Sequence, residues 1–359
     1  MAEKWPCHVL GAGLMGRLLA HCLVKQGHEV HIYEAGTAEG LGAAARVAAS
    51  MLAPLAESAI TESSVVDMGQ YSLSRWPNLI EQLPAPVFFQ QAGTLLLWHR
   101  ADAQQARMLV NKLQLNSQTM AAASHPQPLQ ADQLAALEPE LVGKFHQGLF
   151  LPCEGQLDNR QLLNALLASL ETQKVHVHWN QAVSTDDFVD NASFKHNWVF
   201  DCRGLGAKKD WQSLRGVRGE VIRLHAPQVN ITRPVRLVHP RYPLYIAPKQ
   251  NHVYVIGATE IESDDSSNAS VRSTLELLSA TYSLHSGFAE ARILEINTQL
   301  RPTLNDNLPS IRKLSSNCMQ INGLYRHGFL IAPAIADAVL WHLQGNDTLA
   351  NRFGLFKPL

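Results

Sequence analysis

The first 35 residues alternate between short apolar runs and a stretch with helical spacing. Residues 7–10 form an apolar run that stops at Gly11, and apolar residues then recur every three or four positions from 14 to 23. Residues 30–33 form a second apolar run, which ends at Glu34. The pattern predicts a strand, a helix and a second strand parallel to the first.

The next hundred residues are less regular. Residues 36–54 are rich in glycine and alanine, which indicates a loop. A helix is predicted over about 58–83, broken at Pro77 and ended by Pro84 and Pro86. Residues 88–98 predict a pair of strands with a turn at Gly93, and residues 102–139 predict polar helices with a break near 125–128.

A second block of alternating elements begins at Asn159. Leucines between 162 and 170 predict a helix, and residues 175–179 and 198–201 predict short strands. From Gly219 the pattern favours strands, over 220–225, 244–248, 252–259 and 291–300, with 249–251 as a hairpin turn. A loop over 301–309, a strand near 319–321 and a helix over about 332–344 complete the chain.

Alternating elements that give way to strands and then resume predict an α/β fold. We expect a Rossmann-like (βαβ) nucleotide-binding domain, interrupted by an antiparallel-sheet α+β substrate domain. The first domain is assigned residues 1–84, 150–215 and 301–359, and the second residues 85–149 and 216–300.

Composition excludes several classes of protein. Lys and Arg number 30 against 31 Asp and Glu, so no basic surplus indicates nucleic acid or an anionic membrane as a partner. No stretch approaches 18 uninterrupted apolar residues, which predicts no membrane span. Five scattered cysteines without a CxxC pair indicate reduced thiols, and hence a cytoplasmic location. The sixteen histidines form no HExxH motif, so we predict no metal site.

Residues 11–16 spell a GxGxxG motif between the first strand and the first helix, with glycines at Gly11, Gly13 and Gly16. The first glycine permits a tight turn, the second lets a pyrophosphate approach the backbone, and the third lets helix and strand pack closely. Glu34 ends the second strand, where an acidic side chain accepts hydrogen bonds from ribose hydroxyls. Together these features predict dinucleotide binding.

Several segments resemble the glycine oxidase and D-amino-acid oxidase family of FAD-dependent enzymes. Residues 48–54 (AASMLAP) are similar to its flavin-contacting segment, and residues 216–220 (GVRGE) to its PxRGQ segment. Residues 245–249 (YIAPK) and 255–259 (VIGAT) resemble its YIVPR and VVGAT strands. Residues 300–303 (LRPT) resemble its GLRP segment and residues 325–333 (YRHGFLIAP) its YRNGILLAP segment. The matches follow one another in the family's order along most of the chain.

The resemblance implies three substrate-binding residues. Arg301 matches an arginine that pairs bidentately with the substrate carboxylate, Tyr245 a tyrosine that binds the same group, and Arg326 a second arginine near it. Without the family, Arg301 is as well explained as a surface arginine, Tyr245 as a core residue and Arg326 as a cation stacked on Tyr325.

The resemblance also implies a cofactor, FAD, held without a covalent bond. Cys318 lies well after Arg301, whereas related sarcosine oxidases attach flavin close to that position, so we expect no covalent link. Backbone groups near the isoalloxazine ring would stabilise the reduced flavin, and Val183 would contact the adenine side. Beyond the motif glycines and Glu34, the predicted contacts are Ser50, Met51, Val183, Gly328, Phe329, Leu330 and Ile331.

The function implied is oxidative deamination of a small amino acid: glycine, sarcosine or a small D-amino acid. Hydride would pass from the neutral amine's Cα to flavin N5, and the imino acid would hydrolyse to an oxo acid and ammonia. Dioxygen, reduced to hydrogen peroxide, is the expected acceptor, and thiamine biosynthesis the expected context. The sequence leaves the oligomeric state open.

Three alternatives remain open at this point. The chain could pass electrons to another acceptor, act on a protein-bound amine, or bind flavin without turnover. The family commonly has Gly at Ser50, Asn at His327 and a small-residue turn around Arg203, so these departures leave substrate choice and turnover in question.

Overall fold

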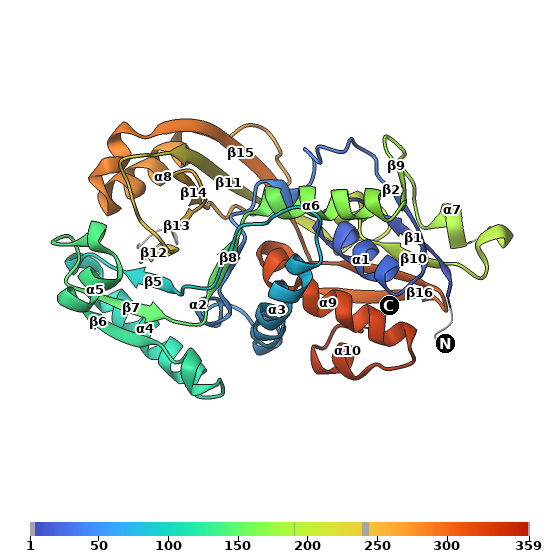
Figure 1. Cartoon of the computed structure of the whole chain (residues 1–359), viewed down its shortest axis with the longest axis horizontal. Coiled ribbons are helices and arrows are strands. Elements are labelled where there is room, and N and C mark those ends of the chain that lie inside the picture. The colour runs from blue at the N-terminus through green and yellow to red at the C-terminus, as the bar shows by residue number, and fades with distance from the viewer. Residues whose placement is uncertain (1–3, 190, 239–243, 358–359) are drawn as a thin grey trace.

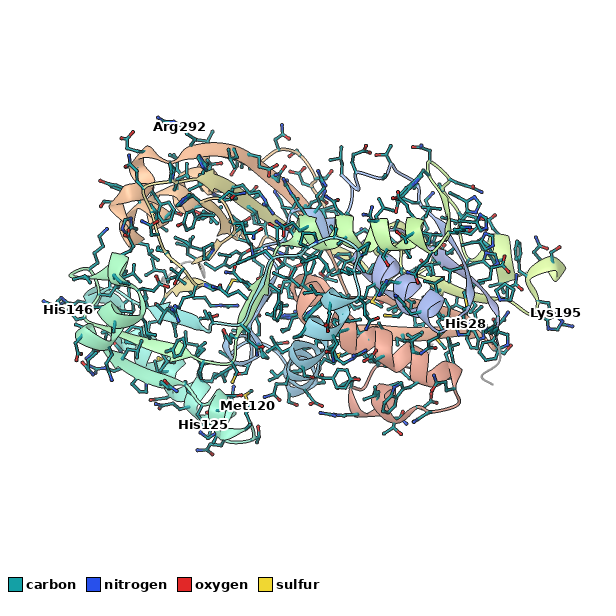
Figure 2. The ribbon with its side chains drawn as sticks, in the orientation of Figure 1. His28, Met120, His125, His146, Lys195 and Arg292 are labelled. Carbon is teal, nitrogen blue, oxygen red and sulfur yellow. The ribbon has the colours of Figure 1, made fainter. Side chains whose placement is uncertain are left out.

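The computed structural model describes residues 4–189, 191–238 and 244–357. Two large sheets lie toward opposite ends of the long axis, and a small sheet and helices lie between them (Figure 1). With side chains drawn, His146 and Arg292 mark the outer part of one end and Lys195 the tip of the other (Figure 2). The α/β fold class is confirmed.

The first large sheet has six strands in the order β16-β17-β10-β1-β2-β9. All neighbours are parallel except β16 and β17, which form an antiparallel pair. Its strands are β1 (Pro6–Leu10), β2 (Glu29–Tyr33), β9 (His176–His178), β10 (Trp198–Asp201), β16 (Ser310–Ser315) and β17 (Cys318–Asn322).

Helices α1 (Leu14–Lys25) and α6 (Asn159–Thr172) pack on this sheet, with α3 (Ser63–Glu81) and α9 (Gly328–Leu343) beside them. Buried leucines of α1 and α6 share one hydrophobic core with the sheet, so segments far apart in sequence form a single unit. The shorter helices α7 (Asp186–Val189) and α10 (Thr348–Arg352) lie at its margin (Figure 1).

One helix is predicted over 58–83 with a break at Pro77, and the structure differs from this at the start and in the middle of the segment. A short helix, α2 (Pro54–Glu57), comes first, and α3 then begins at Ser63 and continues through Pro77. The proline removes one backbone hydrogen bond, but Trp76 and Leu79 on either side are buried in the core. Packing therefore keeps the helix continuous where local chemistry predicted a break.

The last long helix, α9, starts four residues earlier than predicted, at Gly328. It contains Pro333, which cannot donate to the carbonyl of Phe329. Trp76 fills that role, because its indole Nε1 donates to the Phe329 oxygen at 2.9 Å. Residues 328–331 are thus the first turn of a helix rather than a segment leading to one.

The second large sheet has eight strands in the order β15-β11-β14-β13-β12-β5-β7-β6, antiparallel except for β12 and β5. Its strands are β5 (Thr94–Leu97), β6 (Gln127–Gln130), β7 (Gln147–Leu151), β11 (Arg215–His225), β12 (Val235–Leu237), β13 (Leu244–Pro248), β14 (Val253–Gly257) and β15 (Arg292–Thr303). As predicted, residues 249–251 turn between two antiparallel strands, β13 and β14.

Side chains alternate across this sheet as the strand period requires. Ile222, Ile246 and Ile256 point into the core that includes Leu277 of α8 (Val271–Leu284). Val221 and its neighbours on the other face join a separate cluster with the loop around residue 47. One face is therefore covered by helices, and the other is left to the functional cavity. The sequence pattern did not predict α8.

Two further predictions near this sheet are wrong, and a third is incomplete. Residues 88–98 do not form a strand pair: β5 belongs to the eight-stranded sheet, while β4 (Phe89–Gln90) joins β3 (Met51–Leu52) and β8 (Gly155–Leu157) in the small sheet. The break near 125–128 separates α4 (Ala103–Ser117) from α5 (Ala131–Leu137), but it contains β6. Arg301 lies within β15 rather than in a loop, because β15 pairs with β11 as far as Thr303.

Candidate functional site

A cavity of about 860 Å³ extends from the GxGxxG turn to the eight-stranded sheet. Its size lies toward the upper end of small-molecule and cofactor sites. The wall includes the N-terminal ends of α1 and α9, the loop over residues 34–51 and the strands β11, β13 and β15. Residues from all three predicted flavin-contacting regions thus meet in one space.

At the end of the cavity formed by the GxGxxG turn, the three motif glycines have different surroundings. Gly11 has φ +94°, and a Cβ there would lie 2.8 Å from the Cys202 carbonyl oxygen. A Cβ on Gly16 would lie 1.9 Å from the Gly11 oxygen, so only glycine lets α1 pack on β1. Gly13 faces open space and precedes the uncapped start of α1, whose free N–H groups suit a phosphate.

Glu34 lies beside this turn, directly after β2. Its carboxylate accepts from the Ala12 N–H at 2.6 Å and from the Gly36 N–H at 2.9 Å. Carboxylate oxygens have further lone pairs, so the side chain can also accept from ribose hydroxyls. The donors, the glycine turn and the acidic side chain together fit the adenosine diphosphate half of FAD.

Ser50 takes the left-handed conformation, φ 51°, where the related segments commonly have glycine. Its hydroxyl donates to the Leu157 carbonyl at 2.5 Å. Lys249, in the turn after β13, supports the same segment, since its side-chain Nζ donates to the Leu157 and Ala49 carbonyls at 2.7 and 2.9 Å. These bonds hold the strained residue in place, so the departure at Ser50 preserves the loop geometry.

The first turn of α9 forms the middle of the wall, through Gly328, Phe329 and Leu330. No side chain caps this helix, so its N–H groups and positive dipole end are available to an anionic group. His327 precedes it, and burial lowers the imidazole pKa to about 4. The departure from asparagine at this position therefore introduces a neutral ring at neutral pH.

On the sheet, cross-strand pairing sets a row of side chains facing the cavity. Arg236 pairs with Tyr245, and Tyr245 pairs with Gly257. A Cβ on Gly257 would lie 2.5 Å from the Tyr245 hydroxyl, and one on Gly219 would lie 2.3 Å from an Arg301 nitrogen. The two glycines therefore let the tyrosine and the arginine lie close against the sheet.

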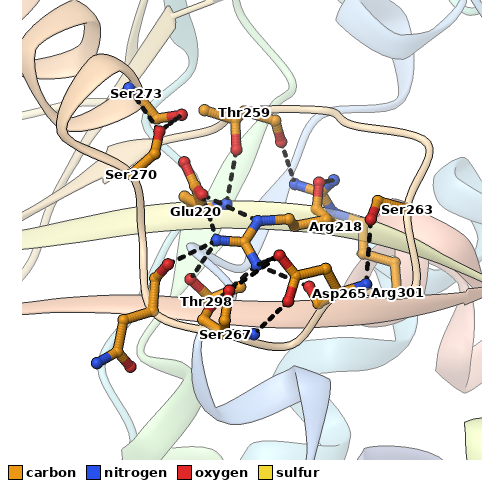
Figure 3. Close-up of polar contacts among 11 residues, drawn as sticks. Arg218, Glu220, Thr259, Ser263, Asp265, Ser267, Ser270, Ser273, Thr298 and Arg301 are labelled. Carbon is orange, nitrogen blue, oxygen red and sulfur yellow. Dashed lines mark hydrogen bonds and ion pairs between the residues drawn. The ribbon is translucent and has the colours of Figure 1, made fainter.

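Arg301 is held by backbone rather than by a carboxylate. Its guanidinium donates to the Thr259 carbonyl at 3.0 Å and, more weakly, to the Arg218 carbonyl at 3.4 Å (Figure 3). Arg218 is itself buried and donates to Glu220 and to the carbonyls of 265, 267 and 268, which fixes the loop after β14. The loop contributes Ser266 to the cavity wall.

The other arginines of the described wall are all paired. Arg203 binds Asp201 and Asp210, Arg236 binds Glu57, and Arg326 binds both Glu57 and Glu260. Burial alone would raise the pKa of Glu57, but the two arginines hold it well below its ordinary value. Arg301 is therefore the one wall arginine in the described ranges without a carboxylate within 4 Å.

Tyr245 supplies a neutral donor beside Arg301. Burial raises the pKa of its phenol, and the nearby arginines only partly oppose this, so the hydroxyl stays protonated. A guanidinium without an anion and a protonated phenol on one sheet face can together bind a carboxylate.

The cavity brings together eleven of the predicted site residues, and three lie outside its wall. Gly16 packs behind the turn, and Ile331 is fully buried in the core. Val183 is half-buried in a small cluster beside β1, and its carbonyl accepts from Arg203 at 2.9 Å. The residues in the wall are Gly11, Gly13, Glu34, Ser50, Met51, Tyr245, Arg301, Arg326, Gly328, Phe329 and Leu330.

Sequence reasoning missed Glu57, Arg236 and Glu260, which complete the charged wall. Arg236 could have been noticed as a lone arginine within an apolar strand, and Glu260 as a charge directly after VIGAT. Two of the histidines, His176 and His178 on β9, form an HxH pair, a spacing that metal sites can use. Across the residues that the structure describes, however, no group of three or more His, Cys, Asp or Glu side chains is arranged to hold a metal.

The fold and cavity define a dinucleotide-binding protein. The profile of the family described as FAD dependent oxidoreductase matches residues 8–340. The chain is 36% identical over 331 residues to a thiamine biosynthesis oxidoreductase, ThiO, of Rhizobium etli, covering 92% of this chain and 94% of that one.

Among solved structures, it resembles glycine oxidase from Geobacillus kaustophilus, with a TM-score of 0.81, 22% identity and coverage of 97% and 96% of the two chains. It also resembles iminodiacetate oxidase from Chelativorans sp. BNC1, with a TM-score of 0.79, 18% identity and 96% coverage of each chain.

The chain therefore belongs to the FAD dependent oxidoreductase family. Within it, the chain is an FAD-dependent oxidoreductase of the glycine oxidase and ThiO type. In the ranges 4–189, 191–238 and 244–357, no helix has both the length and the hydrophobicity needed to cross a membrane.

Proposed function

We propose that this enzyme oxidises the amine of a small amino acid (glycine, sarcosine or a small D-amino acid) and uses dioxygen as its electron acceptor. The observation that carries the proposal is the unpaired guanidinium of Arg301 in a cavity whose other arginines are paired. A partly buried cation without an anion is stabilised by a ligand carboxylate.

Arg301 and Tyr245 would bind the two carboxylate oxygens, the arginine as a two-pronged donor and the tyrosine through its protonated hydroxyl. Fixing the carboxylate orients the amine and Cα of a small substrate relative to the cofactor. Bound FAD would supply the redox chemistry, in which the amine loses two electrons as a hydride, and the protein's own residues supply position.

No side chain of the described wall is placed as a free, strong base. His327 has a pKa lowered to about 4 by burial, and Glu57 and Glu260 are bound to arginines. The enzyme would therefore bind the substrate whose amine is already neutral in solution, because no wall side chain is free to remove a proton from the ammonium form.

We propose that the flavin is held without a covalent bond. Cys318 lies on β17 outside the wall, and Cys202, which does reach the wall, has a pKa raised well above its ordinary value by burial. A protonated thiol is a poor nucleophile. Acid precipitation should accordingly leave FAD in the supernatant, and flavin retained by the precipitate would contradict the claim.

Three further expectations from the sequence are included in this proposal. They are the domain boundaries, the cytoplasmic location and the supply of product to thiamine biosynthesis. The role in thiamine biosynthesis is supported by the name of the Rhizobium etli relative, a thiamine biosynthesis oxidoreductase. Val183 stays a proposed adenine contact, made through backbone atoms.

The proposal is tested by oxygen-dependent peroxide formation from glycine, sarcosine and D-alanine, each at several concentrations. Turnover of at least one of them supports the proposal. If these amines reduce the flavin but no peroxide forms, the enzyme uses an electron acceptor other than dioxygen. Absence of any flavin reduction would refute amine oxidation.

A further inference from the structure

The carboxylate-binding end of the cavity carries five charged side chains on its wall. Arg236, Arg301 and Arg326 are positive, and Glu57 and Glu260 are negative. If all are ionised, one positive charge is in excess. A substrate that brings one carboxylate and a neutral amine would balance it.

Arg326 donates to both glutamates. Its Nε and Nη2 lie 3.1 and 2.5 Å from one Glu57 oxygen, and its Nη1 lies 2.8 Å from a Glu260 oxygen. Every guanidinium nitrogen therefore has a carboxylate acceptor. Nη1 and Nη2 each keep a second N–H, so the substrate-binding role that the resemblance implies for Arg326 stays a prediction.

Glu57 and Glu260 differ in their exposure and in the number of arginines that they bind. Glu57 has a side chain 10% exposed and also binds Arg236 at 2.7 Å. Glu260 follows β14 and has a side chain 44% exposed; within the described ranges it has one ion pair, with Arg326, and a hydrogen bond with Tyr325. Glu260 thus puts a negative charge on the open part of the wall, where it can be changed without removing a buried network.

We propose that Glu260 is a specificity-determining residue that restricts the enzyme to amino acids with a single carboxylate. A second carboxylate near Arg326 would meet Glu260, and like charges brought together in a partly desolvated site weaken binding. The inference rests on the proposed function, since it assumes that Arg301 binds the first carboxylate.

The fold itself does not set this preference. Iminodiacetate oxidase has a similar fold, and iminodiacetate carries two carboxylates. Side chains on the cavity wall can therefore set the selection between one and two carboxylates, and in this chain the wall includes the charge of Glu260.

The test uses the FAD-loaded enzyme and two unreactive probes, acetate with one carboxylate and malonate with two. Their dissociation constants are measured from the change in flavin absorbance, for the wild type, Glu260→Gln and Glu262→Gln. Glu262 is a matched control because it lies two residues away, is 67% exposed, binds Arg215 and is not in the wall. Arg301→Ala is included to test the first carboxylate site.

We expect acetate to bind more tightly than malonate to the wild type, and Glu260→Gln to improve malonate relative to acetate by about tenfold. Glu262→Gln should leave the ratio unchanged. An equal ratio in the wild type and Glu260→Gln, or a wild type that prefers malonate, overturns the inference while leaving the proposed function standing. Acetate binding that is absent, or that persists in Arg301→Ala, overturns the proposed function and the inference with it.

Discussion

Replacing Arg301 with alanine tests the assignment of this arginine as the residue that binds the substrate carboxylate. The guanidinium donates to two backbone carbonyls, those of Thr259 and Arg218, the second at 3.4 Å, and it has no carboxylate within 4 Å in the described ranges. The cost to folding should therefore be small. FAD should stay bound, because the motif glycines and Glu34 lie at the opposite end of the cavity.

The cost to substrate binding should be large. Leaving a desolvated charge without its partner costs roughly 2–5 kcal/mol, which corresponds to a loss of about 30-fold to several thousand-fold in kcat/KM. Because Arg301 is only half-buried, we expect the lower half of this range. Arg301→Lys should restore little, since an ammonium cannot make the paired hydrogen bonds.

The assay is steady-state peroxide formation, with FAD content measured from the flavin spectrum of each variant. Arg215→Ala is the matched control, because Arg215 lies on the neighbouring strand β11, pairs with Glu262 and is outside the wall. A kcat/KM for Arg301→Ala within threefold of the wild type, with FAD in place, would refute the carboxylate assignment.

Two further predictions concern stability. Trp76→Phe leaves the Phe329 carbonyl without a donor, because Pro333 cannot supply one, and should lower the free energy of unfolding by about 1–3 kcal/mol in denaturant titrations; an unchanged midpoint would contradict this account of α9. Burial lowers the pKa of His21 to about 4 from an ordinary value of 6.5, so its contribution to stability is complete above about pH 6.5 and is lost as pH falls toward 4. His21→Gln should flatten the pH dependence of unfolding in that window, and equal slopes for both proteins would argue against a buried neutral imidazole.

Local sequence pattern was sufficient for the first strand, helix and strand of the chain. The strand, glycine turn, helix and acidic residue from 7 to 34 are contiguous, so their geometry follows from short-range chemistry. The antiparallel sheet was predicted as strands, and the family resemblance identified Tyr245 and Arg301, which the structure places in one cavity wall.

What could not be predicted depends on contacts between distant segments. Pro77 lies inside a helix because Trp76 is buried against α9, more than 250 residues away. Glu57 becomes part of the site only because the fold brings Arg236 and Arg326 to it. Short β-strands such as β8 and β12 have too few residues for a periodic pattern, and pairing alone defines them.

The most direct test of amine oxidation at this site is anaerobic reduction of the bound flavin by D-alanine and L-alanine, side by side. If Arg301 and Tyr245 fix the carboxylate, the two enantiomers present opposite substituents to the cofactor, and only one can direct its Cα hydrogen toward it. We predict flavin bleaching by D-alanine and none by L-alanine, with glycine as the reference. Faster reduction by L-alanine would mean that the substrate binds in another pose, and it would contradict the assignment of Arg301 and Tyr245.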